Sequence, residues 1–397
     1  MKIGILKEGK NPPDKRVPFS PEQCSQILKS HPNISMFIQP SDNRCFSDLE
    51  YLECGVNLEE DLSDCDVLMG VKEVPIDMLI KEKIFFFFSH TIKKQPYNKK
   101  LLQNIIKNRI QLIDYETLLD VNGKRIIGFG RYAGIVGCYN TFLAYGKKTK
   151  KYHLEFANLL EDKTCLEREL SKVLLPDNLK IILTGTGRVS SGVVEVLEFL
   201  GIKKISKKDF LNKEFNYPTY VQLNHMDYNE RIDGYPSSKQ DFYNSPHQYR
   251  SSILKYVLCA DIFITGHYFA PNSPIILSRS DIRHKLFKIK VVGDISCDIN
   301  GPIGCTLRPS TINDPIYGYN PVNEMEDDYN KDNVVAVMAV DNLPCSLPKD
   351  ASIDFGRVFI NKILDELLSN GPMISQATIA VDGYLTDRFS YLSDYIS

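Results

Sequence analysis

The sequence predicts an α/β fold with two Rossmann-like domains, each built on a parallel sheet covered by helices, and a cleft between the domains. Three observations predict it. Short apolar runs alternate with helical segments in the first third of the chain, a second alternating series begins at Lys180, and a glycine-rich turn opens that series. Such alternation is typical of parallel sheets. A length of 397 residues suggests two or three domains.

Composition narrows the class of protein. Hydrophobic residues make up 43% of the chain and charged residues 25%, as in soluble globular proteins. The net charge of −2 gives no reason to expect nucleic acid or a membrane surface as partner. The N-terminus lacks a signal-peptide pattern, and no apolar run approaches the roughly 18–20 residues of a membrane span. The ten cysteines contain no C-x-x-C pair, so we expect reduced thiols, no metal site and a cytoplasmic location.

The first alternating series begins at the N-terminus. Ser20 is a suitable N-cap for a helix over Pro21–Lys29, because proline fits the first helical position. A second helix is expected over Tyr97–Lys107, whose apolar residues recur at helical spacing. The expected strands are Lys2–Leu6, Ser35–Ile38, Val67–Val71, Ile84–Phe88 and Gln111–Asp114.

A long helix, from about Ala133 into the basic stretch 146–151, leads to the second series. Residues 224–248 read as a long irregular excursion, and Ile353–Leu368 as a final helix. We therefore expect a substrate and catalytic domain over residues 1–134, completed by 344–397, and a dinucleotide-binding domain over 135–343. The strands expected in the second domain are Ile181–Thr184, Val221–Leu223, Ile262–Thr265, Val291–Val292 and Val334–Val340.

Charged and polar residues follow two strands of the first domain. Lys72 and Glu73 come after Val67–Val71, and Ser89 and His90 come after Ile84–Phe88. Ligands of open α/β sheets bind outside the carboxyl ends of the strands. Adjacent strands would therefore bring Lys72, Glu73 and His90 together as an acid–base set. A surface lysine and a capping histidine are the alternative from these residues alone.

The turn GTGRVSSG at 185–192 predicts a nucleotide site, because it follows an apolar strand and opens a helix. Gly185 suits the tight turn, and Gly187 the close approach of a pyrophosphate. Ser190 replaces the third glycine of the fingerprint. About 20 residues on, where an acid would bind the ribose of NAD, stands Ser206 among four lysines. This favours NADP over NAD, unless an acid from another loop takes that place.

Several segments, in family order along nearly the whole chain, resemble the lysine-forming saccharopine dehydrogenases. They also resemble the lysine–ketoglutarate reductase module of bifunctional lysine-degrading enzymes, in the alanine dehydrogenase and transhydrogenase group. The segments are KRVPFSP at 15–21, GVKE at 70–73, FFSHTIKKQ at 87–95, LIDYETLLDVNGKRIIGFGRYAG at 112–134, GTGRVSSG at 185–192, ADIFITGHYF at 260–269, GDISCDINGPI at 293–303 and AVDNLPCSLPKDAS at 339–352.

The resemblance implies roles for individual residues. Lys72 and His90 match the acid–base residues, and Gly187, Arg188 and Asp294 match positions near the dinucleotide. Lys124 stands where the family commonly has a second arginine near the cofactor. The matches to substrate contacts are Arg16 and Arg125 for carboxylates, Glu73 and Glu116 for the ammonium groups of lysine, and Gln95 and Phe129.

The implied reaction joins L-lysine and 2-oxoglutarate into saccharopine, or reverses it, through an imine and a hydride transfer with NADP or NAD. Histidine and a desolvated lysine suit its proton transfers, and arginines suit its carboxylates. His267 and Tyr268 follow a strand of the second domain, where a cofactor contact or simple capping is expected. Asp14, Lys15 and Asp120 read as solvated charges. Two alternatives stay open: another amino-acid or opine-type dehydrogenase, and a non-catalytic nucleotide sensor. The sequence leaves the physiological direction and the oligomeric state open.

Overall fold

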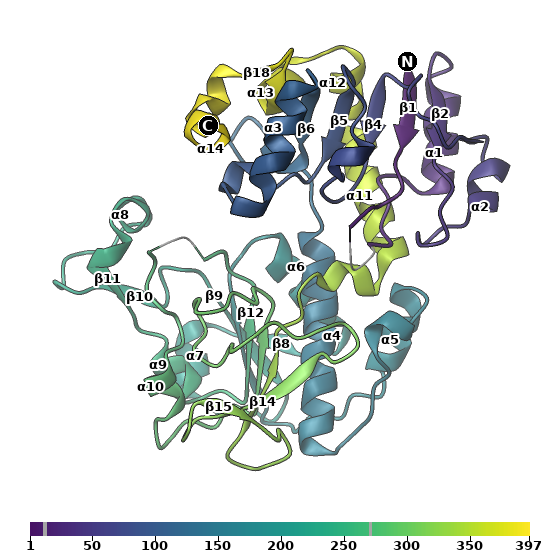
Figure 1. Cartoon of the computed structure of the whole chain (residues 1–397). Helices are drawn as coiled ribbons and strands as arrows, with labels where there is room; N and C mark the ends of the chain where they lie inside the picture. Colours follow the sequence, from purple (N-terminus) through teal and green to yellow (C-terminus); the bar gives the residue numbers. More distant parts are fainter. Residues whose placement is uncertain (11–13, 270–271) are drawn as a thin grey trace. The chain divides into compact units, whose positions relative to one another are not determined.

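The computed structural model describes residues 1–10, 14–269 and 272–397, and the chain divides into two compact units (Figure 1). Unit 1 comprises Met1–Phe129 and Pro348–Ser397, and unit 2 comprises Gly130–Leu347. The breaks thus fall after Phe129 and Leu347, where the sequence predicted domain boundaries after residues 134 and 343. Each unit is an α/β structure with a mostly parallel sheet, which confirms the predicted fold class.

The sheet of unit 1 contains eight strands among the described residues. The six strands from β6 to β3 run parallel, β17 pairs antiparallel with β6, and β18 pairs antiparallel with β17. The C-terminal segment therefore completes the sheet that the N-terminal segment begins. In spatial order the strands are β18 (Tyr384–Leu385), β17 (Thr378–Val381), β6 (Gln111–Asp114), β5 (Ile84–Phe87), β4 (Val67–Met69), β1 (Lys2–Ile5), β2 (Ser35–Ile38) and β3 (Asn57–Leu58).

The run of four phenylalanines fills both faces of this sheet, because successive side chains of a strand point to opposite sides. Phe86 and Phe88 join one core, in which the Phe86 and Phe359 ring centroids lie 5.7 Å apart. Phe85 and Phe87 join the core on the other face. The helices of unit 1 are α1 (Pro21–Ser30), α2 (Asp48–Glu53), α3 (Lys99–Lys107), α11 (Pro348–Lys362), α12 (Leu364–Leu368), α13 (Pro372–Ala377) and α14 (Ser393–Ile396).

Helix α1 begins as predicted. The Ser20 hydroxyl accepts a hydrogen bond from the Gln23 backbone N–H, and the Gln23 side chain accepts one from the Ser20 N–H, so two N–H groups are satisfied reciprocally. The predicted final helix is interrupted at Ile363, where α11 ends and α12 begins. The two antiparallel strands that follow α13 were not predicted.

The sheet of unit 2 also contains eight strands within the described residues. The six strands from β16 to β8 are parallel, while β14 and β15 extend the sheet antiparallel. In spatial order they are β15 (Met325–Asp327), β14 (Ile316–Asn320), β16 (Val335–Met338), β13 (Val291–Asp294), β12 (Ile262–Thr265), β7 (Lys180–Thr184), β9 (Thr219–Leu223) and β8 (Lys203–Lys204).

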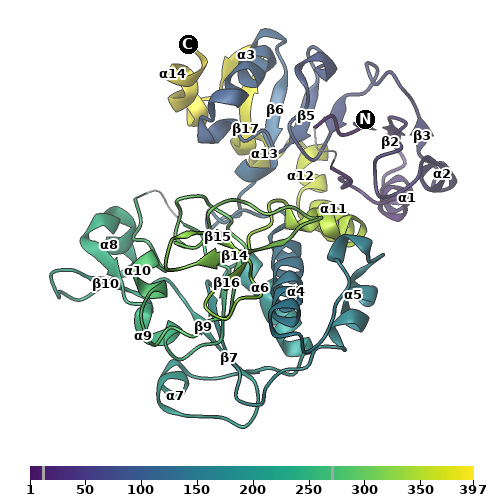
Figure 2. The ribbon, with the colours of Figure 1, turned by 60° about the horizontal axis from the view of Figure 1, so that its bottom comes forward.

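Two helices of unit 2 pack at backbone distance, and Figures 1 and 2 both show them side by side. They are α4 (Gly130–Thr149) and α6 (Arg188–Phe199). A Cβ at Gly134 would lie 1.9 Å from the Val189 carbonyl oxygen, and one at Gly192 1.9 Å from the Arg131 carbonyl oxygen. Glycine is therefore required at both positions, and the contact fixes α6 against the most buried helix of the unit.

The predicted irregular excursion contains short regular elements. An antiparallel pair, β10 (Asn229–Arg231) with β11 (Tyr249–Ser251), encloses α8 (Lys239–Asn244). Figure 1 shows this subdomain apart from the main sheet of unit 2. The remaining helices of unit 2 are α5 (Lys163–Leu170), α7 (Lys207–Asn212), α9 (Leu254–Val257) and α10 (Arg279–Ile282).

Candidate active site and nucleotide site

Three adjacent strands of unit 1 end in polar residues, in the spatial order β5, β4, β1. The ladder between β4 and β5 continues past the strands, because Phe88 N–H donates to the Val71 carbonyl at 3.0 Å. Lys72 and Glu73 follow directly on one strand, and His90 follows on the next. His90 Nδ1 lies 2.6 Å from Glu73 Oε1. The structure thus brings two of the three predicted acid–base residues into direct contact.

His90 is held in a left-handed backbone conformation, with φ 52° and ψ 14°. Such a conformation is unfavourable for residues other than glycine and persists only where the surroundings impose it. Here Asp114 Oδ2 accepts from both the backbone N–H of Ser89 at 2.8 Å and its hydroxyl at 2.6 Å. These bonds anchor the residue before His90 and direct its imidazole toward Glu73.

Glu73 contacts a lysine as well as the histidine. Its Oε2 lies 3.1 Å from Lys10 Nζ, while its Oε1 contacts His90. Burial raises the pKa of Glu73, but the hydrogen bond with His90 and the charges of His90 and Lys10 outweigh it and hold the pKa at about 2. The carboxylate therefore stays ionised and orients the imidazole.

Glu8, which the sequence did not single out, holds the backbone of Lys72. Its Oε1 accepts from the Val71 N–H at 2.5 Å, and its Oε2 accepts from the Lys72 N–H at 2.9 Å. Burial raises the pKa of Glu8 to about 7, although both hydrogen bonds oppose the rise. The pair of bonds fixes the point at which the Lys72 side chain leaves the strand.

The Lys72 ammonium lies in a positive environment. Burial lowers its pKa, and the charges of Arg16 and Lys10 lower it further, while Asp14 and Glu73 act in the opposite direction. A lowered pKa brings a lysine closer to the range in which it exchanges protons at neutral pH. Lys72 is therefore suited to act as an acid or a base.

The Arg16 guanidinium is buried against a carboxylate and an aromatic ring. Its Nε donates to Asp14 Oδ1 at 2.9 Å and its Nη2 to Asp14 Oδ2 at 2.6 Å. Its central carbon lies 4.1 Å from the Phe129 ring centroid, and that ring stacks on Phe355. Reading Asp14 as a solvated charge was wrong, because its side chain is only 1% exposed. Its burial with Arg16 is a tertiary effect that the local sequence does not reveal.

Glu116, which follows the end of β6, lies beside two cationic side chains. Glu116 Oε1 lies 2.8 Å from Arg125 Nη2 and 3.3 Å from Lys93 Nζ. Its other oxygen, Oε2, is buried and has no hydrogen-bond partner among the residues that the structure describes. Burial raises the pKa of Glu116, but Arg125, Lys93 and His90 together lower it below its usual value. The unpartnered oxygen can receive a further cation or hydrogen-bond donor.

Two other predicted residues of unit 1 lie in different surroundings. The Gln95 side chain accepts a hydrogen bond from the Tyr97 hydroxyl. Lys124 is exposed in a turn, where its backbone N–H donates to Asp120 Oδ1 at 2.8 Å. Neither contact tests the role that the resemblance implied.

The glycine-rich turn of unit 2 leads into the N-terminus of α6. Gly185 has φ +92°, and a Cβ there would lie 2.3 Å from the Gly266 carbonyl oxygen. Gly187 is the N-cap of α6, and a Cβ there would meet no atom within 4 Å among the described residues. Arg188 is exposed at the first position of the helix, while the Ser190 hydroxyl donates to the Gly266 carbonyl at 3.0 Å. Open space at a helix N-terminus suits an anionic group.

His267 lies beside this turn. Its Nδ1 is 2.7 Å from the Thr184 hydroxyl, and its Nε2 is buried with no partner in the described part of the chain. Burial lowers the pKa of His267 to about 4, against the charge of Asp294. The ring is therefore neutral near pH 7. The next residue, Tyr268, is exposed.

Asp294 holds a loop together. Its Oδ1 accepts from the hydroxyls of Thr265 at 2.9 Å and Ser296 at 2.6 Å, and its Oδ2 accepts from Thr306 at 2.6 Å. Ser206, the predicted ribose position, is the N-cap of α7, where its hydroxyl accepts from the Asp209 N–H at 3.0 Å. Both side chains thus have structural partners of their own.

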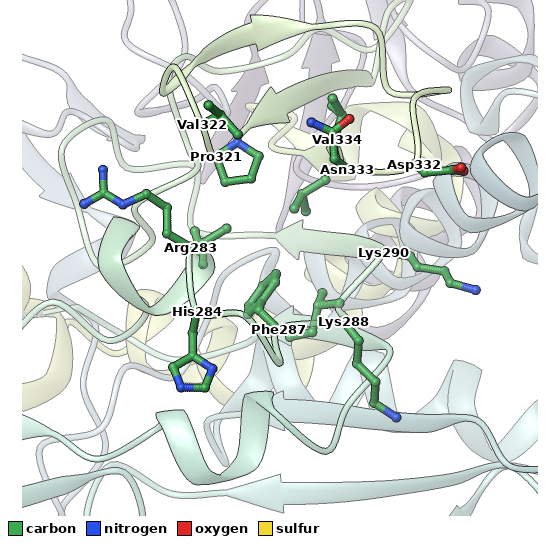
Figure 3. Close-up of a pocket in the computed structure, with 13 residues that line it drawn as sticks. Arg283, His284, Phe287, Lys288, Lys290, Pro321, Val322, Asp332, Asn333 and Val334 are labelled. Carbon is green, nitrogen blue, oxygen red and sulfur yellow. The ribbon is translucent and has the colours of Figure 1, made fainter.

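A cavity of about 530 Å³ lies in unit 2 at the amino ends of β13 and β16, the ends opposite to those at which the glycine-rich turn follows β7. Figure 3 shows that Arg283, Lys288 and Lys290 extend in different directions at its rim. The three cationic side chains therefore do not converge on one point where an anion could bind.

Among the described residues, no group of three His, Cys, Asp or Glu side chains is arranged to hold a metal ion. None of the described helices is long and apolar enough to span a membrane.

The fold is that of the alanine dehydrogenases and transhydrogenases. The structure matches an L-alanine dehydrogenase over 100% of both chains with a TM-score of 0.66 and 16% identity. It matches a transhydrogenase from Sinorhizobium meliloti over 97% of this chain and 100% of that one, with a TM-score of 0.62 and 12% identity. These identities establish a shared fold and nothing finer.

Sequence comparison adds the nearer relatives. Residues 4–136 match the family "Alanine dehydrogenase/PNT, N-terminal domain". The chain is 29% identical to the mitochondrial alpha-aminoadipic semialdehyde synthase of Rattus norvegicus, over 98% of this chain and 47% of that protein. It is 23% identical to the saccharopine dehydrogenase [NAD(+), L-lysine-forming] of Yarrowia lipolytica, over 92% of each. The chain spans about half the length of the semialdehyde synthases that it matches. These matches confirm the predicted resemblance to the saccharopine dehydrogenases and to the alanine dehydrogenase and transhydrogenase group.

Proposed function

We propose that the chain is a nicotinamide-dependent oxidoreductase that interconverts saccharopine with L-lysine and 2-oxoglutarate, with unit 1 as substrate domain and unit 2 as dinucleotide domain. The observation that carries the proposal is the arrangement after β4 and β5. There a lysine of lowered pKa follows one strand, and a histidine on an ionised glutamate follows the next. The names of the relatives supply the substrates, and the residues of unit 1 suit their chemistry.

Lys72 and His90 are the proposed acid–base pair. Joining the ε-amine of lysine to the keto group forms a carbinolamine, whose hydroxyl must be protonated to leave as water. The amine nitrogen must give up one proton to become a nucleophile and a second once the C–N bond has formed, both before water leaves. Glu73 keeps the imidazole oriented, and Glu8 keeps the Lys72 backbone in place.

The charged residues around the pair suit the rest of the substrate. The buried, unpartnered Oε2 of Glu116 supports a role in receiving an ammonium group of lysine. Arg125 is 41% exposed, and a guanidinium matches a substrate carboxylate in geometry and charge. Arg16 is 3% exposed and paired with Asp14, so we assign it mainly the positive field that acts on Lys72. Gln95 and Phe129 remain proposed substrate contacts.

The cofactor is proposed to be a nicotinamide dinucleotide, NADP in preference to NAD, which when bound exchanges a hydride with the imine carbon. Gly185, Gly187 and Arg188 would hold its pyrophosphate, and Nε2 of His267 offers a polar contact beside the turn. Tyr268, Asp294 and Lys124 remain candidates from the sequence. Asp294 would act by fixing its loop, because its carboxylate is occupied by three hydroxyls.

A steady-state screen tests the proposal. NADPH and NADH oxidation would be followed separately with a panel of amino acids against a panel of keto acids. We expect turnover that requires both L-lysine and 2-oxoglutarate, with NADPH the better cofactor. Turnover with a different pair, such as an amino acid with pyruvate, would replace the substrates and keep the class. Nucleotide binding without turnover on any pair would make the chain a sensor and contradict the proposal.

A further inference from the structure

The strand order of unit 2 differs from the order of its strands along the sequence. The chain runs β7, α6, β8, α7, β9, but the strand beside β7 is β9, and β8 lies outside it at the edge. Two hydrogen bonds join the glycine turn to the end of β9. Gly185 N–H donates to the Leu223 carbonyl at 2.7 Å, and the Gln222 side chain donates to the Gly185 carbonyl at 3.0 Å.

In dinucleotide-binding sheets, the ribose acid stands at the carboxyl end of the strand next to the glycine-turn strand. Counting along the sequence leads to Ser206, which follows the edge strand β8. Adjacency in the sheet leads to the residues after β9, a loop comprising Asn224, His225, Met226 and Asp227. No such distinction can be drawn without the strand order.

The one carboxylate of this loop already has partners. Asp227 Oδ2 accepts from the Asn224 N–H at 2.9 Å, and Asp227 Oδ1 forms an ion pair with Lys207 Nζ. The Asp227 side chain is 12% exposed and that of Lys207 is 50% exposed. The Asn224 side-chain oxygen accepts from the Met226 N–H at 2.8 Å. The side chain of Lys207, the first residue of α7, is therefore half-exposed beside the loop, while the carboxylate of the loop is largely covered.

We infer that the Asn224–Asp227 loop binds the adenosine ribose and accepts a 2′-phosphate there, together with Lys207, which its ion pair with Asp227 holds against the loop. A ribose diol requires a carboxylate that accepts its hydrogen bonds. The carboxylate of Asp227 is already occupied by Lys207 and by the Asn224 backbone N–H. A phosphate requires hydrogen-bond donors, and the ammonium group of the half-exposed Lys207 side chain supplies them. The inference rests on the proposed nucleotide binding and names the residues that select the nucleotide.

Binding of two fragments to the full chain, measured by calorimetry, tests the inference without turnover. The probes are ADP-ribose and 2′-phospho-ADP-ribose. We expect the phosphorylated probe to bind the unmodified chain more tightly. Lys207→Met should weaken that probe roughly tenfold to a hundredfold, the usual effect of losing a charge-assisted bond, and leave ADP-ribose nearly unchanged. Lys208→Met, the neighbouring exposed lysine, is the matched control and should change neither.

A second pair of variants separates the two positions. Aspartate can replace Asn224 in its turn and Ser206 at its N-cap with little strain, because both residue types serve there. Asn224→Asp should shift preference toward ADP-ribose, and Ser206→Asp should leave it unchanged. The reverse result would overturn the inference and return the ribose position to Ser206. Preference for ADP-ribose in the unmodified chain, lost in Asp227→Asn, would also overturn it. If neither probe bound, the proposed nucleotide function would fail as well.

Discussion

Nδ1 of His90 and Oε1 of Glu73 lie 2.6 Å apart and join the ends of two neighbouring parallel strands. The contact links residues 17 positions apart in the chain. A histidine oriented in this way by a carboxylate is a common device of proton-transfer sites. Its partner in the proposed chemistry, Lys72, is fixed through its backbone by Glu8.

Removing either proton-transfer group should slow turnover. Lys72→Met keeps most of the side-chain bulk without the amine, and His90→Gln keeps a hydrogen-bonding group that does not titrate. We expect kcat to fall about 10²- to 10⁴-fold in each, the usual contribution of a positioned acid or base. Each variant should also lose one limb of a bell-shaped pH profile of kcat/KM. Variants that fold normally and retain both limbs and nearly full kcat would exclude the pair.

Arg125→Ala should weaken substrate binding selectively. The lost charge-assisted bond to a carboxylate costs about 1.5–3 kcal/mol, so KM should rise roughly 10- to 150-fold. Nucleotide affinity, measured separately by calorimetry, should stay nearly constant. Lys15→Ala, at an exposed cation of unit 1, serves as control. An equal loss of nucleotide and substrate affinity in Arg125→Ala would argue against a substrate contact.

Arg16→Ala should destabilise unit 1. The substitution leaves Asp14 buried without its bidentate partner, and breaking a buried pair from one side typically costs about 3–5 kcal/mol. Urea denaturation followed by circular dichroism measures the loss. Removing both partners should be less harmful, so the double variant Asp14→Ala with Arg16→Ala should recover part of the stability. Equal or additive losses would mean that the two side chains do not act as a pair.

Glu8 gives unit 1 a stability that depends on pH. Its pKa is raised to about 7 in the folded chain from 4.5, so its contribution is complete below pH 4.5 and lost as pH rises through 7. The unmodified chain should thus lose about 2 kcal/mol relative to Glu8→Gln between pH 4.5 and 8, since each pKa unit corresponds to about 1.4 kcal/mol and partial exposure weakens the effect. Denaturation curves at several pH values measure this, with the exposed Glu59→Gln as control. Parallel curves for Glu8→Gln and the unmodified chain would disprove the coupling.

The strand-end rule predicted the core of the candidate site because apolar runs and their polar ends are local in sequence. Val67–Val71 and Ile84–Phe88 were placed to within two residues, and Lys72, Glu73 and His90 followed from them. The same rule applied to Lys2–Leu6 would have indicated Glu8 and Lys10, which follow β1. Both were passed over because a charged N-terminal segment looks like ordinary surface.

Other features depend on contacts that no local pattern encodes. Asp14 is buried beside Arg16, whose guanidinium lies over the Phe129 ring. Strand β17 joins the sheet from more than 260 residues away from β6. Ser206 was selected because sequence distance was taken as a measure of strand position. The insertion of β9 between β7 and β8 removes that correspondence.

The identity of the product tests the central claim most directly. The chain would be incubated with L-lysine, 2-oxoglutarate and NADPH carrying deuterium at the transferable position, and the product would be analysed by mass spectrometry. The account predicts one compound that contains every carbon of both substrates, lacks one oxygen lost as water and carries one deuterium. Oxidised NADPH without that adduct, or an adduct formed from a different amino acid and keto acid, would contradict it.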